Sequence, residues 1–291
     1  MKNIATLYSQ AAIEKRQLIS FEIFPPKGDL TMETAREVAQ GIGLAQPDFV
    51  SVTYSAGGSG NKQATAEIVE MIQKDHNIPT MAHLTCFDAT HDSIDAIMQD
   101  YRARGINNVL ALHGDPIPGV QPADFTYSRD LIELLVDNGF CVGAAAYPEG
   151  HITCESIHDS ISHLVEKQKA GASFFITQLF FDNEFFYRFY DSALNAGISV
   201  PISCGIMPFL SKSQITRMVF TCGASLPSPI IKLLAKWEHD PESLRKAGIE
   251  YAINQLIDLS DHGVSGLHVY SMNHPNIAQS TAQALRSHWQ A

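Results

Sequence analysis

The sequence predicts a (β/α)8 barrel, the TIM-barrel fold of the α/β class. Along the 291 residues, eight short apolar runs alternate with longer segments of helical periodicity. The short runs are apolar on both faces, as expected of parallel strands that are covered on both sides. A glycine follows several of the helical segments, where a left-handed residue would turn the chain back into a strand. An open, doubly wound sheet has the same alternation and is the structural alternative.

The predicted strands are short and rich in β-branched and aromatic residues, which favour a pleated, buried conformation. In chain order they are 18–24 (LISFEIF), 49–53 (FVSVT), 80–85 (TMAHLT), 108–112 (NVLAL), 141–146 (CVGAAA), 174–179 (FFITQL), 201–206 (PISCGI) and 267–270 (LHVY).

The predicted helices lie between these strands and are rich in residues of high helix propensity. In chain order they are 31–44, 62–75, 92–104, 128–137, 156–170, 184–196, 213–221, an extra turn at 230–236, and 241–261. The glycines expected to end helices with a left-handed cap are Gly105, Gly139, Gly171, Gly197 and Gly263.

The composition is that of a folded protein with an acidic surface. Hydrophobic residues make up 45% of the chain and charged residues 18%, which is too apolar for a disordered protein. Lys and Arg number 20 against 31 Asp and Glu, so the formal net charge is −11. This charge argues against nucleic acid or an anionic membrane as a partner. An anionic ligand must therefore meet local cationic groups or helix N-termini.

The chain is expected to form a single domain over residues 1–291 in the cytoplasm. No low-complexity linker interrupts it, its N-terminal segment 1–20 lacks the apolar core of a signal peptide, and no apolar run approaches the roughly 18 to 20 residues that span a bilayer. The five cysteines are odd in number and form no C-x-x-C pair. They indicate a reducing compartment and no metal site.

Polar residues gather at the predicted carboxyl ends of the strands, where barrel enzymes build their active sites. Glu22 lies in the first strand of a closed barrel, which offers it no solvated edge. Asp115, in a Gly-Asp-Pro sequence, also has a plain interpretation as a turn residue, and His83 has one as a core histidine. Gln178 lies among aromatic residues, where a buried amide needs hydrogen-bond partners. The other polar residues at these ends are Thr53, Tyr54, Thr85, His113, Tyr147, Glu149, Thr177, Tyr270 and Asn273.

The common nucleotide and hydrolase motifs are absent from the sequence. It contains no G-x-G-x-x-G, G-x-x-x-x-G-K-[ST], H-E-x-x-H or G-x-S-x-G, and the glycine-rich stretch 57–60 matches none of them. A dinucleotide, if one binds, does not use a Rossmann crossover.

Seven segments resemble the methylenetetrahydrofolate reductase family, in family order and over nearly the whole chain. They are SFEIFPP at 20–26, FVSVTY at 49–54, HLTC at 83–86, ALHGD at 111–115, AAYPE at 145–149, AGA at 170–172 with ITQ at 176–178, and HVYSMN at 268–273. The chain is similar to the short bacterial form, which lacks the regulatory C-terminal domain of the eukaryotic enzymes.

The resemblance implies a flavoprotein of one-carbon metabolism and methionine supply. FAD would be reduced by NADH or NADPH and would pass a hydride to 5,10-methylenetetrahydrofolate, giving 5-methyltetrahydrofolate. Glu22 would be the general acid that opens the imidazolidine ring, a role that needs a proton available near neutral pH. Asp115 would favour the positive charge of the iminium and make the flavin harder to reduce. Gln178 would contact the folate or the nicotinamide.

The resemblance also implies a set of binding residues. The FAD contacts would be Thr53, His83, Leu112, His113, Gly114, Asp115, Tyr147, His151, Lys167 and Ala172. Either Asp159 or Ser160 would add a further contact, and Tyr270 would lie on the substrate side. Three positions depart from the family: His113 and His274 replace frequent arginines, and Met218 replaces an aromatic residue that stacks on the nicotinamide cofactor.

Two other functions remain open at this stage. One is a pterin-binding barrel methyltransferase that uses the same rim without flavin. The other is a lyase or aldolase with Glu22 as base, which ranks last because no strand-end lysine is placed for a Schiff base. The preference between NADH and NADPH stays open, and the family suggests a homo-oligomer.

Overall fold

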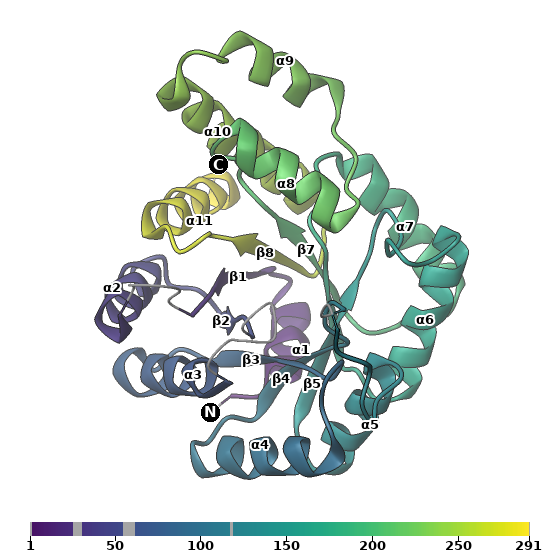
Figure 1. Cartoon of the computed structure of the whole chain (residues 1–291). Helices are drawn as coiled ribbons and strands as arrows, with labels where there is room; N and C mark the ends of the chain where they lie inside the picture. Colours follow the sequence, from purple (N-terminus) through teal and green to yellow (C-terminus); the bar gives the residue numbers. More distant parts are fainter. Residues whose placement is uncertain (1, 26–30, 55–61, 117–118, 291) are drawn as a thin grey trace.

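The computed structural model describes residues 2–25, 31–54, 62–116 and 119–290, and its eight parallel strands close into a barrel (Figure 1). The strands follow one another in chain order, and β1 pairs with both β2 and β8. The predicted (β/α)8 barrel is therefore confirmed, and the open sheet is excluded. Pro26 and the glycine-rich stretch 57–60 lie outside the described residues.

The strands agree with the prediction to within one or two residues. They are β1 (Leu18–Ile23), β2 (Phe49–Val52), β3 (Thr80–Thr85), β4 (Asn108–Leu112), β5 (Cys141–Ala146), β6 (Phe174–Thr177), β7 (Ile202–Ile206) and β8 (Gly266–Tyr270). Because β6 ends at Thr177, Gln178 lies just beyond the strand instead of within it.

The helices between the strands also agree closely with the prediction. They are α2 (Met32–Gly43), α3 (Lys62–His76), α4 (His91–Ala103), α5 (Ser128–Asp137), α6 (Ile157–Lys169), α7 (Asn183–Asn195), α8 (Lys212–Cys222), α9 (Ser228–Lys236) and α10 (Pro241–Asp261). The five glycines expected to cap helices all have φ between +70° and +102°. Within the described ranges, every helix falls short of the length and apolarity needed to span a membrane.

Two helices were not predicted, and the first of them, α1 (Ile4–Glu14), closes the amino-terminal end of the barrel. The amide of Ile4 donates to Asn108 Oδ1 at 2.9 Å, and Tyr8 Oη lies 2.6 Å from Ser203 Oγ. In Figure 1 this helix lies behind the ring of strands. The segment precedes the first strand, so the alternation of strands and helices gave no reason to expect it.

The second helix that was not predicted, α11 (Pro275–Gln290), follows β8 and completes the outer ring. It packs against α2 and α10, which Figure 1 shows on either side of it. Its buried residues Ile277, Ala278, Thr281, Ala282 and Leu285 have the spacing of one helix face.

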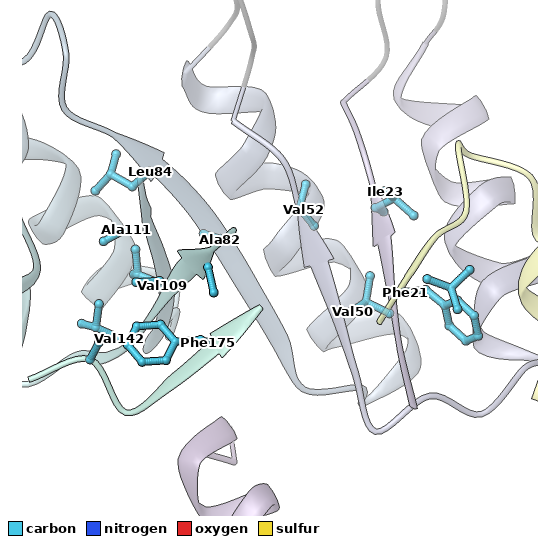
Figure 2. Packing of buried hydrophobic residues seen from close by; sticks show 14 of the residues in the cluster. Phe21, Ile23, Val50, Val52, Ala82, Leu84, Val109, Ala111, Val142 and Phe175 are labelled. Carbon is cyan, nitrogen blue, oxygen red and sulfur yellow. The ribbon is translucent and has the colours of Figure 1, made fainter. Parts of the chain in front are cut away.

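Alternate strand residues point out of the barrel and form the main core beneath the helices. Figure 2 shows part of this layer, with Phe21 and Ile23 on β1 beside Val50 and Val52 on β2.

The side chains that point into the barrel change from apolar to polar along its axis. At the amino-terminal end they form an apolar plug with α1, which includes Leu18, Phe49, Met81, Leu110 and Phe174. Nearer the carboxyl ends lie the buried polar side chains of Ser20, Ser51, His83 and His268. This polar layer lies directly beneath the rim where an active site is expected.

Candidate active site

Glu22 is the last residue but one of β1, and its carboxylate faces two buried histidines. Glu22 Oε2 lies 3.5 Å from Nε2 of His83 on β3 and 3.7 Å from Nε2 of His268 on β8. The Glu22 side chain is 18% exposed, whereas His268 is fully buried. A carboxyl group at the mouth of the barrel therefore has imidazoles on its inner side and access to the rim on its outer side.

The surroundings of the two imidazoles determine their hydrogen bonds and their charge. His268 Nδ1 lies 2.8 Å from Ser20 Oγ, and the Nε2 atoms of both rings are buried with no hydrogen-bond partner among the described residues. Burial lowers the pKa of His83 to about 4, an effect that Glu22 opposes and His268 reinforces. His83 is therefore neutral near pH 7.

The loop after β8 fixes the end of β1 beside this carboxylate. Ser271 Oγ donates to the Glu22 carbonyl at 2.7 Å, and Asn273 accepts from the Phe24 amide at 3.0 Å and donates to the Phe24 carbonyl at 2.9 Å. Met272 and Asn273 both have positive φ, +53° and +56°, which is unusual for residues other than glycine. Strained backbone of this kind persists where the surrounding structure enforces it, often at functional sites.

Tyr270 reaches across the rim from β8 to β6. Its hydroxyl donates to the Thr177 carbonyl at 2.6 Å, and Thr177 Oγ1 accepts from the Gly205 amide of β7 at 2.8 Å. Burial is the main cause that raises the pKa of Tyr270, with the Glu22 charge next. The phenol thus stays neutral and lies close to Glu22.

A second group of polar residues lies where β4 and β5 end. The rings of Tyr147 and His151 meet edge to face with centroids 4.6 Å apart, and Lys167 Nζ lies 5.4 Å from the Tyr147 centroid. Lys167 Nζ donates to the Ala145 carbonyl at 2.9 Å, its one hydrogen bond within the described ranges. Burial lowers the pKa of Lys167 to about 8. A cation held here without a carboxylate partner is suited to an anionic ligand.

The turn after β4 brings three further predicted residues, His113, Gly114 and Asp115, to the second group. Asp115 is exposed, and its charge raises the pKa of Tyr147, although burial of that phenol is the larger cause. His113 Nδ1 lies 3.1 Å from the carbonyl of Gly114. Gly114 has φ +92°, and a Cβ on it would lie 3.0 Å from Cβ of Thr85, so the backbone comes close to β3 here.

Asp159 and Ser160 occupy different environments at the start of α6. Ser160 is buried, and its Oγ accepts from the His151 amide at 3.2 Å. Asp159 is exposed, and its carboxylate accepts from Ser156 Oγ at 2.7 Å. Ser160 thus belongs to the group around His151, whereas Asp159 lies in the first turn of α6 and bonds to the N-cap residue Ser156.

Gln178 and Met218 lie between the residues around Glu22 and the second group around Tyr147 and Lys167. Gln178 Oε1 accepts from the Leu179 amide at 2.9 Å, and the residue lines a small hollow with Tyr147. Met218 of α8 packs against the apolar cluster that includes Leu179 and Tyr270.

The remaining predicted residues are more scattered. Thr53 and Leu112 lie at the ends of β2 and β4, and burial lowers the pKa of His274, with a smaller effect from Arg245. Ala172 is not brought to the rim, because it is buried in the turn that leads from α6 into β6, at the opposite end of the barrel.

Sequence reasoning singled out neither His268 nor Ser20. His268 precedes Tyr270 by two residues and so shares its inward face, and Ser20 has the same relation to Glu22. The strand period is the signal that could have identified both.

Comparison with known proteins gives a consistent result. A family model described as methylenetetrahydrofolate reductase matches residues 7–286. A 5,10-methylenetetrahydrofolate reductase of Pectobacterium carotovorum is 34% identical over 95% of this chain and 93% of its own length, and that of Escherichia coli K12 is 33% identical with the same coverage. Methylenetetrahydrofolate reductase 1 of Schizosaccharomyces pombe is 34% identical over 87% of this chain, but the match spans 43% of that longer protein.

Solved structures show the same fold. A Clostridium thermocellum protein described as binding two copies of 5-methyl-5,6,7,8-tetrahydrofolic acid aligns with TM-score 0.65 and 19% identity, over 98% of this chain and 100% of that one.

Proposed function

Because the chain belongs to the methylenetetrahydrofolate reductase family, we propose that it reduces 5,10-methylenetetrahydrofolate to 5-methyltetrahydrofolate with NADH or NADPH through bound FAD. The bacterial relatives support this, since the match covers nearly all of their length. The observation that carries the proposal is the Glu22 carboxyl group, which is placed at the open end of the barrel against two imidazoles.

The second group of polar residues fits a flavin dinucleotide. Lys167 is a cation with no carboxylate partner among the described residues, and His113 and His151 lie near it at a turn where Gly114 brings the backbone close. Such groups would hold the diphosphate, and Tyr147, Ser160, Thr53, Leu112 and Asp115 would border the cofactor. When bound, FAD supplies the hydride carrier between the two substrates.

Glu22 would supply the proton for opening the folate ring. Its carboxyl group gives a proton to an amine nitrogen of the five-membered ring, and the electrons of the breaking C–N bond go to that nitrogen. The substrate is left as an iminium cation, which the carboxylates of Glu22 and Asp115 favour electrostatically. Gln178 would orient the folate or the nicotinamide. Met218, Tyr270 and His274 would line the substrate side.

An anaerobic titration of the flavin-loaded protein tests the proposal. NADH or NADPH should bleach the flavin, and 5,10-methylenetetrahydrofolate should restore its colour. E22Q should keep flavin reduction nearly unchanged and lose about 10²- to 10⁴-fold in the folate step. E37Q, which changes an exposed glutamate on α2, is the matched control.

Three outcomes would contradict parts of the proposal. A protein that stays colourless after incubation with FAD would exclude a flavoenzyme. Methyl transfer from folate without consumption of NAD(P)H would select the methyltransferase alternative. Equal loss of both half-reactions in E22Q would exclude the acid role. A homo-oligomer and a cytoplasmic location remain predictions, to be measured by light scattering and cell fractionation.

A further inference from the structure

His268 is a buried polar residue to which the proposed function gives no role. Its ring stacks on Phe49 with centroids 6.3 Å apart and meets Tyr270 edge to face at 5.2 Å. These contacts fix the plane of the ring. Its Nδ1 has Ser20 Oγ as a partner at 2.8 Å, whereas its Nε2 has no hydrogen bond within the described part of the chain and points to Glu22 Oε2 at 3.7 Å.

The surroundings of Ser20 and His268 indicate which nitrogen of His268 carries the proton. If Nδ1–H donated to Ser20, the fully buried Ser20 hydroxyl would keep a proton with no acceptor among the described residues. If the hydroxyl donates to Nδ1 instead, its proton is satisfied and the ring proton lies on Nε2. Both arrangements leave one donor without a hydrogen bond among the described residues, the Ser20 hydroxyl in the first and Nε2–H in the second. Only the second turns that donor toward a carboxylate oxygen, Glu22 Oε2 at 3.7 Å, so the second arrangement is favoured.

We infer that His268 is a positioning residue for Glu22: Ser20 holds its Nε2–H toward Glu22 Oε2, where it stabilises the carboxylate that remains after the proton has been given to the folate nitrogen. The inference rests on the proposed function, in which Glu22 is the acid. No electrons move between molecules in this step. Solvent returns the proton to Glu22 through its exposed outer side after the product leaves. The 3.7 Å separation must shorten by about 0.7 Å to become a hydrogen bond, as catalytic contacts often do when substrate binds.

The other groups that face Glu22 do not replace His268. His83 on β3 is as close, at 3.5 Å, but no hydrogen bond within the described ranges fixes its tautomer. Tyr270 on β8 already donates its proton to Thr177. Ser51, which pairs in register with Glu22 from β2, carries no charge. Of these neighbours, His268 is therefore the one whose N–H group is oriented toward Glu22 by a hydrogen bond on its other ring nitrogen.

Three variants test this role in the flavin-loaded protein. H268L removes the N–H group at similar volume and should slow the folate half-reaction roughly 10- to 100-fold, while flavin reduction by NAD(P)H stays near the wild-type rate. H268Q places an amide donor near the same point and should restore most of the rate. S20A should lie between them. H158L, which changes an exposed histidine on α6, is the control.

The pH profile of the folate half-reaction separates this role from a structural one. Without the N–H group the carboxylate is less favoured, so the protonated acid persists and the alkaline limb should move to higher pH by about one unit in H268L. The limb of H268Q should stay in place. An unshifted limb in H268L together with a wild-type rate would overturn the inference, as would equal losses in both half-reactions.

A measurement without cofactor or turnover tests the tautomer directly. In ¹⁵N-histidine spectra of the cofactor-free protein, His268 should carry its proton on Nε2, and S20A should shift the population toward Nδ1–H. A wild-type ring protonated on Nδ1 would overturn the inference. If the wild-type protein reduces no folate, or if E22Q keeps full activity, the proposed function itself fails. If E22Q is inactive and H268L is normal, the inference about His268 alone fails.

Discussion

At the scale of single residues, Lys167 carries the clearest electrostatic consequence. Burial lowers its pKa to about 8, so an amine that is charged at pH 7 begins to lose its proton just above physiological pH. A bound diphosphate would raise this pKa again, because it stabilises the ammonium form. Binding of an anionic cofactor is therefore expected to take up protons above pH 8.

We expect K167M to weaken FAD binding about 10- to 100-fold, which is the loss of one charge-assisted hydrogen bond. In the wild-type protein the dissociation constant should rise above pH 8 by up to about tenfold per pH unit. That rise should vanish in K167M. Fluorescence titration across pH 7–10 measures both effects. K169M, which removes an exposed lysine from the same helix, should behave as the wild type, and a similar loss there would contradict a specific role for Lys167.

His83 makes stability depend on pH in a definite direction. Its pKa is lowered in the folded protein to about 4 from an ordinary value of 6.5. The unfolded chain therefore binds more protons between pH 6.5 and 4, and the free energy of unfolding falls as the pH is lowered through that window. The full effect is at most about 3 kcal/mol.

In denaturant titrations of the cofactor-free protein, H83Q should lose less stability between pH 6.5 and 4 than the wild type does. The difference between the two curves isolates His83 from the other titrating groups. Parallel curves would show that the buried imidazole is protonated as easily as in water.

The sequence predicted some residues of the candidate site and not others, for a physical reason. Glu22 stands out because a carboxylate in an apolar strand of a closed barrel has a large desolvation cost. His268 does not, since a histidine in a buried strand is usually a core residue. Its importance comes from Ser20 and Glu22, which are distant in sequence and meet it only when β8 pairs with β1.

At the scale of elements, the loop after β8 acts as a clamp on the end of β1. Asn273 makes two hydrogen bonds to the Phe24 backbone while its own φ is +56°. Asparagine tolerates this conformation better than most residues and its amide supplies both a donor and an acceptor. The element that carries Glu22 is thus held from outside its own strand.

We expect N273A to lower the free energy of unfolding by about 1–3 kcal/mol, because two backbone groups lose their partners. The folate half-reaction should fall with it, since the end of β1 also positions Glu22. Thermal melting and stopped-flow reoxidation measure the two effects. N195A, at the exposed end of α7, should change neither. A wild-type folate rate in N273A would argue against the clamp.

Most elements could be predicted because strand and helix periods differ and because glycine ends many of the helices. The two that were not predicted, α1 and α11, lie at the ends of the chain. The apolar face of α1 is evident only once the barrel exists, since Ile4 and Tyr8 pack against the inward residues of strands far along the sequence. The spacing of apolar residues within a segment can show that a helix has an apolar face. It cannot show which other part of the chain packs against that face.

At the scale of the whole molecule, barrel closure itself brings the candidate site together. Glu22 and His268 come from the first and last strands, which are neighbours only in a closed sheet. The net charge of −11 makes this important, because the proposed ligands FAD, NAD(P)H and folate are all anionic and would have to be held by a few local groups. An open sheet would not bring Glu22 and His268 together at one rim.

Gly205 is a strand position where the closed barrel leaves no room for a side chain. The Tyr270 hydroxyl passes over it from β8 to reach Thr177 on β6, and a Cβ added there would clash with the Thr177 carbonyl and lie 2.6 Å from that hydroxyl. We expect G205A to lower the free energy of unfolding by about 1–3 kcal/mol, the usual effect of overpacking. It should also slow the folate half-reaction, because Tyr270 must move.

G43A is the matched control, since a Cβ there would make an ordinary contact of 3.5 Å with Ile78. Chemical denaturation and single-turnover reoxidation of both variants provide the comparison. If G205A lowers both the free energy of unfolding and the rate of the folate half-reaction while G43A lowers neither, the Tyr270–Thr177 hydrogen bond over β7 contributes both to barrel stability and to the reaction. Wild-type behaviour of G205A in both measurements would mean that β6 and β8 are held by the strand ladders alone, and that the Tyr270 bridge contributes nothing to the rim.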